Sequence, residues 1–200
     1  MTREELLPIA KPILFNTEMV QAILEGRKTV TRRVIKPKHK GASGIKIMGG
    51  YVYDVIPIDF IDGQTQTVEY QRAPYEAGDY LYVRETWTDP TPEQSGYPIL
   101  YMADMPMRWE EDDVTLKAED YKWKPSIHMP KEAARIFLKI MHVRVERLQD
   151  METADDSNYK KEGAKDKHDF IGIWNSTTSK ANNWYANPWV WVIEFEKVEV

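Results

Sequence analysis

The chain has 200 residues, a formal net charge of −5 and 42% hydrophobic residues, which is typical of one soluble globular domain with a substantial core. It has no cysteine, which excludes disulfides, iron–sulfur clusters, thiolate zinc sites and cysteine nucleophiles. No apolar run approaches the roughly 20 residues of a membrane span. The first ten residues include Glu4 and Glu5 and lack the apolar centre of a signal peptide. We therefore expect a soluble, cytoplasmic protein.

A short helix followed by a strand is the first clear pattern along the chain. Asn16 or Thr17 can cap the helix, its apolar residues repeat at helical spacing, and Gly26 can end it. Residues 29–35 are rich in β-branched side chains and are followed by Pro37. These features predict a strand directly after the helix.

Charge is unevenly distributed. Residues 27–40 hold seven basic side chains and no acidic one, so this segment can attract a polyanion although the chain as a whole is acidic. Residues 102–120 hold seven acidic side chains against two basic ones. A solvated loop explains the acidic segment most simply, and a surface that binds a protein partner is the alternative.

Most of the later elements are predicted strands, marked by alternating or β-branched residues. They cover residues 45–48, 51–58, 79–87, 134–148 and 189–200. Gly49-Gly50 predicts a tight hairpin turn between the first two strands. Within 134–148 the apolar residues change parity, which indicates a bulge or two strands. Two further helices are expected, at 153–162 with Gly163 as its end, and at 169–176.

Many short strands with few helices predict an α+β, mainly β fold, most simply a small closed barrel with peripheral helices. The whole chain, residues 1–200, then forms one domain. Two segments are interpreted as insertions, about 36–69 and 88–124. The second contains several prolines and the acidic residues, so we expect it to be the more mobile.

The common catalytic motifs are absent from the sequence. It contains no phosphate-binding loop, dinucleotide-binding glycine motif, nucleophile elbow or zinc-protease motif. The four histidines stand far apart without metal-ligand spacing, so we expect no metal and no cofactor. His128 lies close to two prolines, and such a histidine is more often structural than a ligand.

The densest chemistry lies in the string from Gly26 to Arg33. Lys28 has cationic neighbours, which favour its neutral form, and a neutral lysine can take a proton from a hydroxyl such as that of Thr31. A third polar residue would then orient the lysine or relay the proton. The same string can bind phosphate, or it can be a solvated edge strand. In a regular strand Lys28 and Thr31 point to opposite faces, so the sequence leaves their convergence open.

Three segments in this order resemble the ASCH domain (activating signal cointegrator homology), which has a PUA-like β-barrel. They are Lys11–Phe15, Gly26–Arg33 and Gly78–Trp87. Three further segments resemble the longer ASCH proteins of bacteriophages and prophages: Trp123–Pro130, Glu162-Gly163 and Asn187–Trp191. The resemblance covers most of the chain outside the two insertions.

The resemblance implies a barrel pocket that faces RNA or a nucleoside. A compact bacterial branch of the family hydrolyses N4-acetylcytidine, and its motif Lys-Thr-x-Thr-x-Arg matches Lys28–Arg33. Its catalytic lysine and threonine would fall on Lys28 and Thr31, and its glutamate on Glu162. Other relatives are proposed to bind nucleic acid or to cleave RNA. The two insertions make this chain longer than the compact enzymes.

Aromatic and charged residues are expected to line the pocket beside this motif, because aromatic rings stack on bases and cations bind phosphate or carbonyl oxygens. Trp87 either stacks on a base or packs in the core. Arg84 and Glu85 are predicted to form an ion pair at the rim. The candidate ligand-binding residues are Arg27, Arg33, Arg84, Glu85, Trp87 and His128.

Three functions fit these residues. The favoured one is binding of RNA or of a nucleoside or nucleotide, with no membrane partner. The second is amidohydrolysis of an N4-acylated cytidine-like substrate, with Thr31 as nucleophile, Lys28 as its base and Glu162 as the orienting or proton-relay group; RNA cleavage is the other enzymatic alternative. The third is a phage protein whose acidic insertion binds a protein partner.

Overall fold

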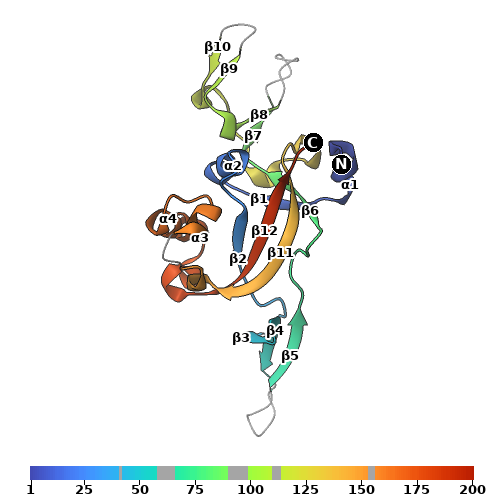
Figure 1. Ribbon diagram of the computed structural model, residues 1–200, viewed down its shortest axis with the longest axis vertical. Helices are drawn as coiled ribbons and strands as arrows, with labels where there is room; N and C mark the ends of the chain where they lie inside the picture. The colour runs from blue at the N-terminus through green and yellow to red at the C-terminus, as the bar shows by residue number, and fades with distance from the viewer. Residues whose placement is uncertain (41, 58–65, 90–98, 110–113, 153–155) are drawn as a thin grey trace. The chain divides into compact units, whose positions relative to one another are not determined.

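The structure is a computed structural model of the chain. It describes residues 1–40, 42–57, 66–89, 99–109, 114–152 and 156–200. Over these residues helix and strand are present in about equal amounts, and the strands form several sheets (Figure 1). The fold is therefore mixed α/β. Each helix in these ranges is too short or too polar to cross a lipid bilayer.

The largest sheet has five strands, hydrogen-bonded in the order β1-β6-β11-β12-β2. Two- and three-stranded sheets are built from the segments that were interpreted as insertions: β3-β4-β5, β7-β8 and β9-β10. None of the sheets closes into a barrel within the described ranges. The predicted mixture of helices and strands is thus confirmed, but strands do not predominate and a barrel is not shown.

The chain divides by its internal contacts into two compact units. Unit 1 comprises Met1–Thr29, Gly78–Lys139 and Phe195–Val200. Unit 2 comprises Val30–Ala77 and Ile140–Glu194. The boundary between Thr29 and Val30 falls inside the basic string that carries the predicted catalytic residues.

Unit 1 contains the N-terminal helices and the strands around the second insertion. Its elements are α1 (Arg3–Ile9), β1 (Lys11–Leu14), α2 (Thr17–Leu24), β6 (Tyr80–Arg84), β7 (Trp87–Thr88), β8 (Leu100–Tyr101), β9 (Met107–Trp109), β10 (Val114–Leu116) and the first residues of β11 (Phe137–Arg147). Short 3-10 helices lie between them: η2 (Met102–Asp104), η3 (Ala118–Asp120), η4 (Ser126–His128) and η5 (Lys131–Ala133). The predicted strand 79–87 is two strands, β6 and β7.

Local signals explain both helices of unit 1. Asn16 caps α2 by accepting a hydrogen bond from the backbone N–H of Met19 at 2.9 Å, and Gly26 follows the helix with a φ of +73°, which glycine adopts without strain. The predicted helix is therefore confirmed. Helix α1 was not predicted, although Thr2 and Glu5 form a capping box at its start.

The core of unit 1 forms where β6 and the start of β11 pack against α1. β1 pairs in parallel with β6, and β6 pairs antiparallel with Phe137–Lys139. The buried residues of this cluster are Leu6, Ala10, Tyr82, Trp87, Met129, Ala133, Ala134 and Phe137. Several belong to segments that carry the ASCH resemblance.

Unit 2 contains β2 and the C-terminal helices. Its elements are β2 (Val30–Val34), β3 (Gly44–Met48), β4 (Tyr51–Pro57), β5 (Gln66–Gln71), the remainder of β11, η6 (Leu148–Met151), α3 (Ser157–Lys161), α4 (Lys167–Thr177), η7 (Lys180–Asn182), η8 (Trp184–Ala186) and most of β12 (Trp189–Val198). Its core packs aromatic rings of α3, α4 and η8 against β12: Tyr159, Phe170, Trp174, Trp184, Val190 and Val192.

Several predictions for unit 2 are confirmed. β3 and β4 form an antiparallel hairpin with Met48 opposite Tyr51, and Gly49 and Gly50 both have positive φ (Figure 1). The strand predicted over 189–200 is β12, and the helix predicted over 169–176 is the longer α4. α3 is shorter than the predicted 153–162.

One prediction about β11 is corrected. Of the two alternatives, a bulge or two strands, the second was wrong, because β11 is one strand of 11 residues. Some predicted features lie outside the described residues: the end of the first hairpin at Ile58, acidic residues 110–113 and the helix start at Thr153.

Candidate functional site

Strand β2 places the last four residues of the basic string, Val30 to Arg33, in unit 2. It pairs antiparallel with β12, with Thr31 opposite Ile193 and Arg32 opposite Val192. Thr31 and Arg33 lie on one face of the strand and Arg32 on the other, as alternation requires. The structure buries Thr31 and Arg32 almost completely and leaves Arg33 half-buried.

A buried ion pair joins β2 to the end of α3. Arg32 Nη1 donates to Glu162 Oε1 at 2.9 Å, and the two side chains are only 2% and 4% exposed. Glu162 is the C-cap of α3, and Gly163 with a φ of +88° ends the helix directly after it. Desolvation of two charges is costly, so such a pair persists where the geometry satisfies both partners.

The ion pair continues into a wider charge network. Arg32 Nη2 lies 3.5 Å from Glu146 Oε2 on β11. Glu146 also contacts Arg144, which reaches Glu194 on β12. Negative and positive groups therefore alternate from Glu162 to Glu194 within unit 2.

Two polar atoms in unit 2 are buried without a hydrogen-bond partner among the residues that the structure describes. They are Nε of Arg32 and the hydroxyl of Tyr159. Burial raises the pKa of Tyr159, and Glu152 and Asp156 raise it further, so the hydroxyl keeps its proton at neutral pH. Buried donors without partners are uncommon in proteins, and each calls for an explanation.

Arg33 and Thr31 form a second hydrogen-bonded pair on β2. Arg33 Nη1 donates to Thr31 Oγ1 at 2.8 Å and to the carbonyl oxygen of Arg32 at 3.2 Å. Burial lowers the pKa of Arg33, while Glu162 and Tyr75 oppose that shift. An arginine stays protonated in this setting, so the threonine hydroxyl accepts a bond from a positive charge.

Lys28 belongs to unit 1 and is 2% exposed. Its backbone N–H donates to the carbonyl oxygen of Ala22 at 2.9 Å, which fixes it directly after α2. Its Nζ lies 5.6 Å from the ring centroid of Phe15, whose ring is 6.2 Å from that of Phe195. Thr31 and Glu162 belong to unit 2, so the set Lys28–Thr31–Glu162 stays a prediction.

Glu85 is buried in unit 1, but its partner is not the predicted one. Arg135 donates to both carboxylate oxygens of Glu85 at 3.0 Å, and it also donates to both oxygens of Asp104 at 2.6 and 3.0 Å. Arg84 instead donates to the carbonyl oxygens of Met129, at 3.1 Å, and Ile127. The expected ion pair between Arg84 and Glu85 was therefore wrong, because each of the two side chains binds another partner.

The other predicted ligand-binding residues of unit 1 lie in different settings. Trp87 is buried in the core, with Nζ of Lys124 lying 4.5 Å from its ring centroid, which agrees with the packing alternative. His128 is exposed on η4. Arg27 is exposed, and it pairs with Glu25.

Sequence reasoning missed Arg135, Asp104 and Glu146. Arg135 lies 50 residues from Glu85, and no local pattern connects them. Glu146 lies in an alternating strand whose charged residues look like an ordinary solvated face. Strand pairing brings Glu146 to Arg32, and the folding of the second insertion brings Asp104 to Arg135.

The described residues include no group of three or more histidine, aspartate or glutamate side chains that could hold a metal ion. Comparisons with protein-family models, with curated proteins and with solved structures found no match. Strand β2 and the end of α3 supply three chemical groups: the guanidinium of Arg32, the hydroxyl of Thr31 and the carboxylate of Glu162.

Proposed function

We propose that the chain is an ASCH-type protein with a PUA-like core that binds RNA or a nucleoside through the basic string. The proposal rests on the positions of the buried polar side chains. The structure describes eight buried polar or charged residues, and three of them, Thr31, Arg32 and Glu162, lie on β2 and at the end of α3 in unit 2. Buried ionisable groups cluster at functional sites because folding alone gains little from them.

The donors and acceptors of unit 2 match the edge of an aminopyrimidine. Glu162 supplies carboxylate oxygens, which accept from an exocyclic amino group such as N4 of cytosine. The Nε of Arg32, which has no hydrogen-bond partner among the described residues, can donate to the ring nitrogen or the carbonyl oxygen. The pair with Arg32 holds the Glu162 carboxylate in place before a ligand arrives.

Hydrolysis of an N4-acylated cytidine is the second candidate, and one contact favours it. Thr31 Oγ1 accepts a hydrogen bond from the positive Arg33 guanidinium, which stabilises the hydroxyl oxygen as negative charge develops on it. In the mechanism that the ASCH resemblance implies, Thr31 attacks the acyl carbon and the lysine of the motif, Lys28, takes the hydroxyl proton. Glu162 orients the groups or relays the proton to the amine as the C–N4 bond breaks, and water then hydrolyses the acyl-threonine to release acetate.

Calorimetric titration with cytidine, uridine and N4-acetylcytidine tests the binding proposal. We expect cytidine to bind more tightly than uridine, and we expect Glu162→Gln to weaken cytidine binding by about tenfold. Glu194→Gln is the matched control, because it makes the same change at the far end of the charge network and should leave affinity within about twofold. Absence of binding by all three nucleosides and by a short single-stranded RNA contradicts the proposal.

A turnover assay separates the two candidates. N4-acetylcytidine is incubated with the protein, and cytidine and acetate are quantified by chromatography. If the chain is a hydrolase, Thr31→Val abolishes turnover and Thr31→Ser retains part of it, while both variants keep the fold. Binding without turnover leaves the chain as a binding protein.

A further inference from the structure

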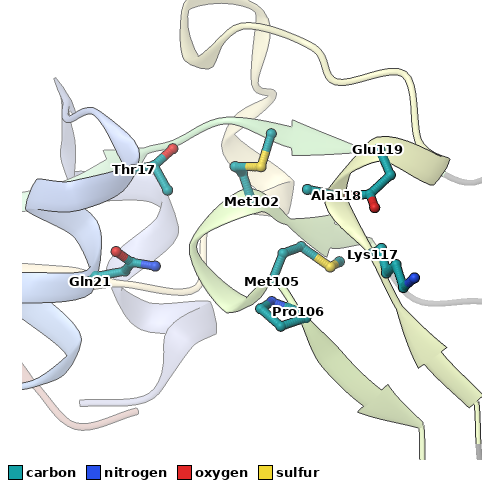
Figure 2. Close-up of a pocket in the computed structure, with 8 residues that line it drawn as sticks. All are labelled: Thr17, Gln21, Met102, Met105, Pro106, Lys117, Ala118 and Glu119. Carbon is teal, nitrogen blue, oxygen red and sulfur yellow. The ribbon is translucent and has the colours of Figure 1, made fainter.

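A cavity of about 540 Å³ lies within unit 1, and none of its lining residues belongs to the predicted nucleoside site. Side chains of α2 form one wall, and the segments around η2 and η3 form the rest (Figure 2). Its lining residues are Thr17, Gln21, Met102, Met105, Pro106, Lys117, Ala118 and Glu119. Small-molecule sites typically have volumes of roughly 300–1,000 Å³.

The segment that carries Met102 and Met105 is fixed by contacts on two sides. Gln21 Nε2 donates to the carbonyl oxygen of Ala103 at 3.1 Å, which ties η2 to α2. Asp104, the next residue, accepts two hydrogen bonds from Arg135. Met105 follows directly and lines the cavity. The methionines therefore sit on a segment fixed from two sides, which favours a preformed site.

The wall around η3 is fixed as well. Nε1 of Trp123 donates to the carbonyl oxygen of Ala118 at 2.7 Å. Asp120 and Lys117 bond to each other, the backbone N–H of Asp120 donating to the Lys117 carbonyl oxygen at 3.1 Å. Figure 2 shows Met102 and Met105 lying between the α2 side chains and residues 117–119.

The lining chemistry indicates what the cavity accepts. Methionine thioethers make favourable contacts with aromatic rings, and proline and alanine add apolar surface. Gln21 uses its amide N–H on Ala103, so its carbonyl oxygen is left as an acceptor. In the part of the chain that the structure describes, the Glu119 carboxylate has no hydrogen bond or ion pair. Thr17 adds a hydroxyl, so acceptors outnumber the one obligate donor, Lys117.

We propose that this cavity binds a small planar aromatic molecule that carries an N–H donor on its ring. The ring lies against Met102 and Met105. Its N–H donates to Gln21, Glu119 or Thr17 at the polar margin. This site shares no residue with the nucleoside site proposed in unit 2, so ligand binding at the two sites can be followed through different residues.

Methyl NMR of the full chain labelled with ¹³C-methyl methionine tests the proposal, with indole and benzofuran as probes. The two probes have nearly the same shape, but only indole carries an N–H. We expect indole to shift the Met102 and Met105 signals in a saturable manner and benzofuran to bind about fivefold more weakly. Met141, exposed in unit 2, is the internal control and should not shift.

Three variants complete the test. Ala118→Leu fills the cavity and should abolish the Met102 and Met105 shifts, whereas Ala181→Leu makes the same change on exposed η7 and should preserve them. Glu119→Gln should weaken indole and leave benzofuran unchanged. Equal affinity for both probes overturns the N–H requirement. No shift with either probe, or shifts that persist in Ala118→Leu, overturn the site itself, while the nucleoside titrations remain interpretable because they report on unit 2.

Discussion

Each unit contains an arginine that pairs with a buried glutamate and a second carboxylate, but the two networks differ in completeness. In unit 1 Arg135 makes four hydrogen bonds to Glu85 and Asp104, and its guanidinium lies 3.9 Å from the ring centroid of Tyr101. In unit 2 Arg32 makes one hydrogen bond to Glu162 and one longer contact, and its Nε has no partner among the described residues.

This difference separates a structural role from a functional one. A polar network in which nearly every donor and acceptor is paired rigidifies the fold and has little left for a ligand. A network with an unsatisfied buried donor retains hydrogen-bonding capacity. Both networks include residues from segments that resemble the ASCH domain, Glu85 from one and Arg32 from another. The resemblance therefore marks framework and candidate site alike.

The largest effect is expected where the complete network is broken. Arg135→Met removes all four hydrogen bonds and leaves Glu85, 1% exposed, as a buried carboxyl without its cation. We expect the free energy of unfolding to fall by about 3–5 kcal/mol. Urea unfolding followed by circular dichroism measures this change.

Lys11→Met is the control for that measurement. It removes an exposed ion pair with Asp79 in the same unit, where both groups stay hydrated. We expect a loss below about 1 kcal/mol. If Arg135→Met were no more destabilising than Lys11→Met, the hydrogen bonds between Arg135 and its two carboxylates would not stabilise the fold.

The incomplete network should be the weaker contributor to stability. Arg32→Met removes one short hydrogen bond to Glu162, and Glu146 remains about a quarter exposed to water. We expect a loss of about 2–3 kcal/mol in urea unfolding. The double variant Arg32→Met/Glu162→Gln should recover part of it, because no buried charge is left unpaired. A loss equal to that of Arg135→Met contradicts the contrast between the two networks.

Local chemistry made part of this fold predictable. Asn16 and Gly26 define the ends of α2, Gly49-Gly50 defines the hairpin of β3 and β4, and Gly163 ends α3 at the residue expected. Each of these signals acts within a few residues. The capping box of Thr2 and Glu5 is of the same kind, so α1 was equally readable in the sequence.

The pairings of the candidate site could not be predicted in the same way. Arg32 and Glu162 are separated by 130 residues, and Arg135 and Glu85 by 50. Their partners depend on strand order and on which side of a strand each residue faces. Residue type and resemblance singled out Thr31, Glu85 and Glu162 in the sequence, and the structure buries all three. The partner of Glu85 is Arg135, which belongs to none of the sequence motifs.

A smaller effect is expected at Thr31. Thr31→Val keeps the shape of the side chain and removes the hydroxyl that accepts from Arg33. We expect a loss of about 1 kcal/mol in the free energy of unfolding, while Thr31→Ser, which keeps the oxygen, should lose less. Equal losses for valine and serine would show that the methyl group, not the hydrogen bond, matters for stability.

The smallest effect is expected from pH, because two opposing influences act on Glu85. Burial raises the pKa of Glu85, and the hydrogen bonds and charge of Arg135 oppose the rise without cancelling it. The folded chain then holds this proton more tightly than the unfolded chain, so ionisation of Glu85 favours unfolding. Its contribution to stability is present below the usual glutamate pKa and is lost as pH rises through the folded value.

Glu85→Gln isolates this contribution, because glutamine does not ionise. We expect the free energy of unfolding of the wild type, minus that of Glu85→Gln, to decrease as pH rises from about 4 to about 7. Urea unfolding of both proteins at each pH gives this difference and removes the titration of every other group. If this difference instead increased with pH, the attraction of Arg135 for the ionised Glu85 would outweigh the cost of burying its charge.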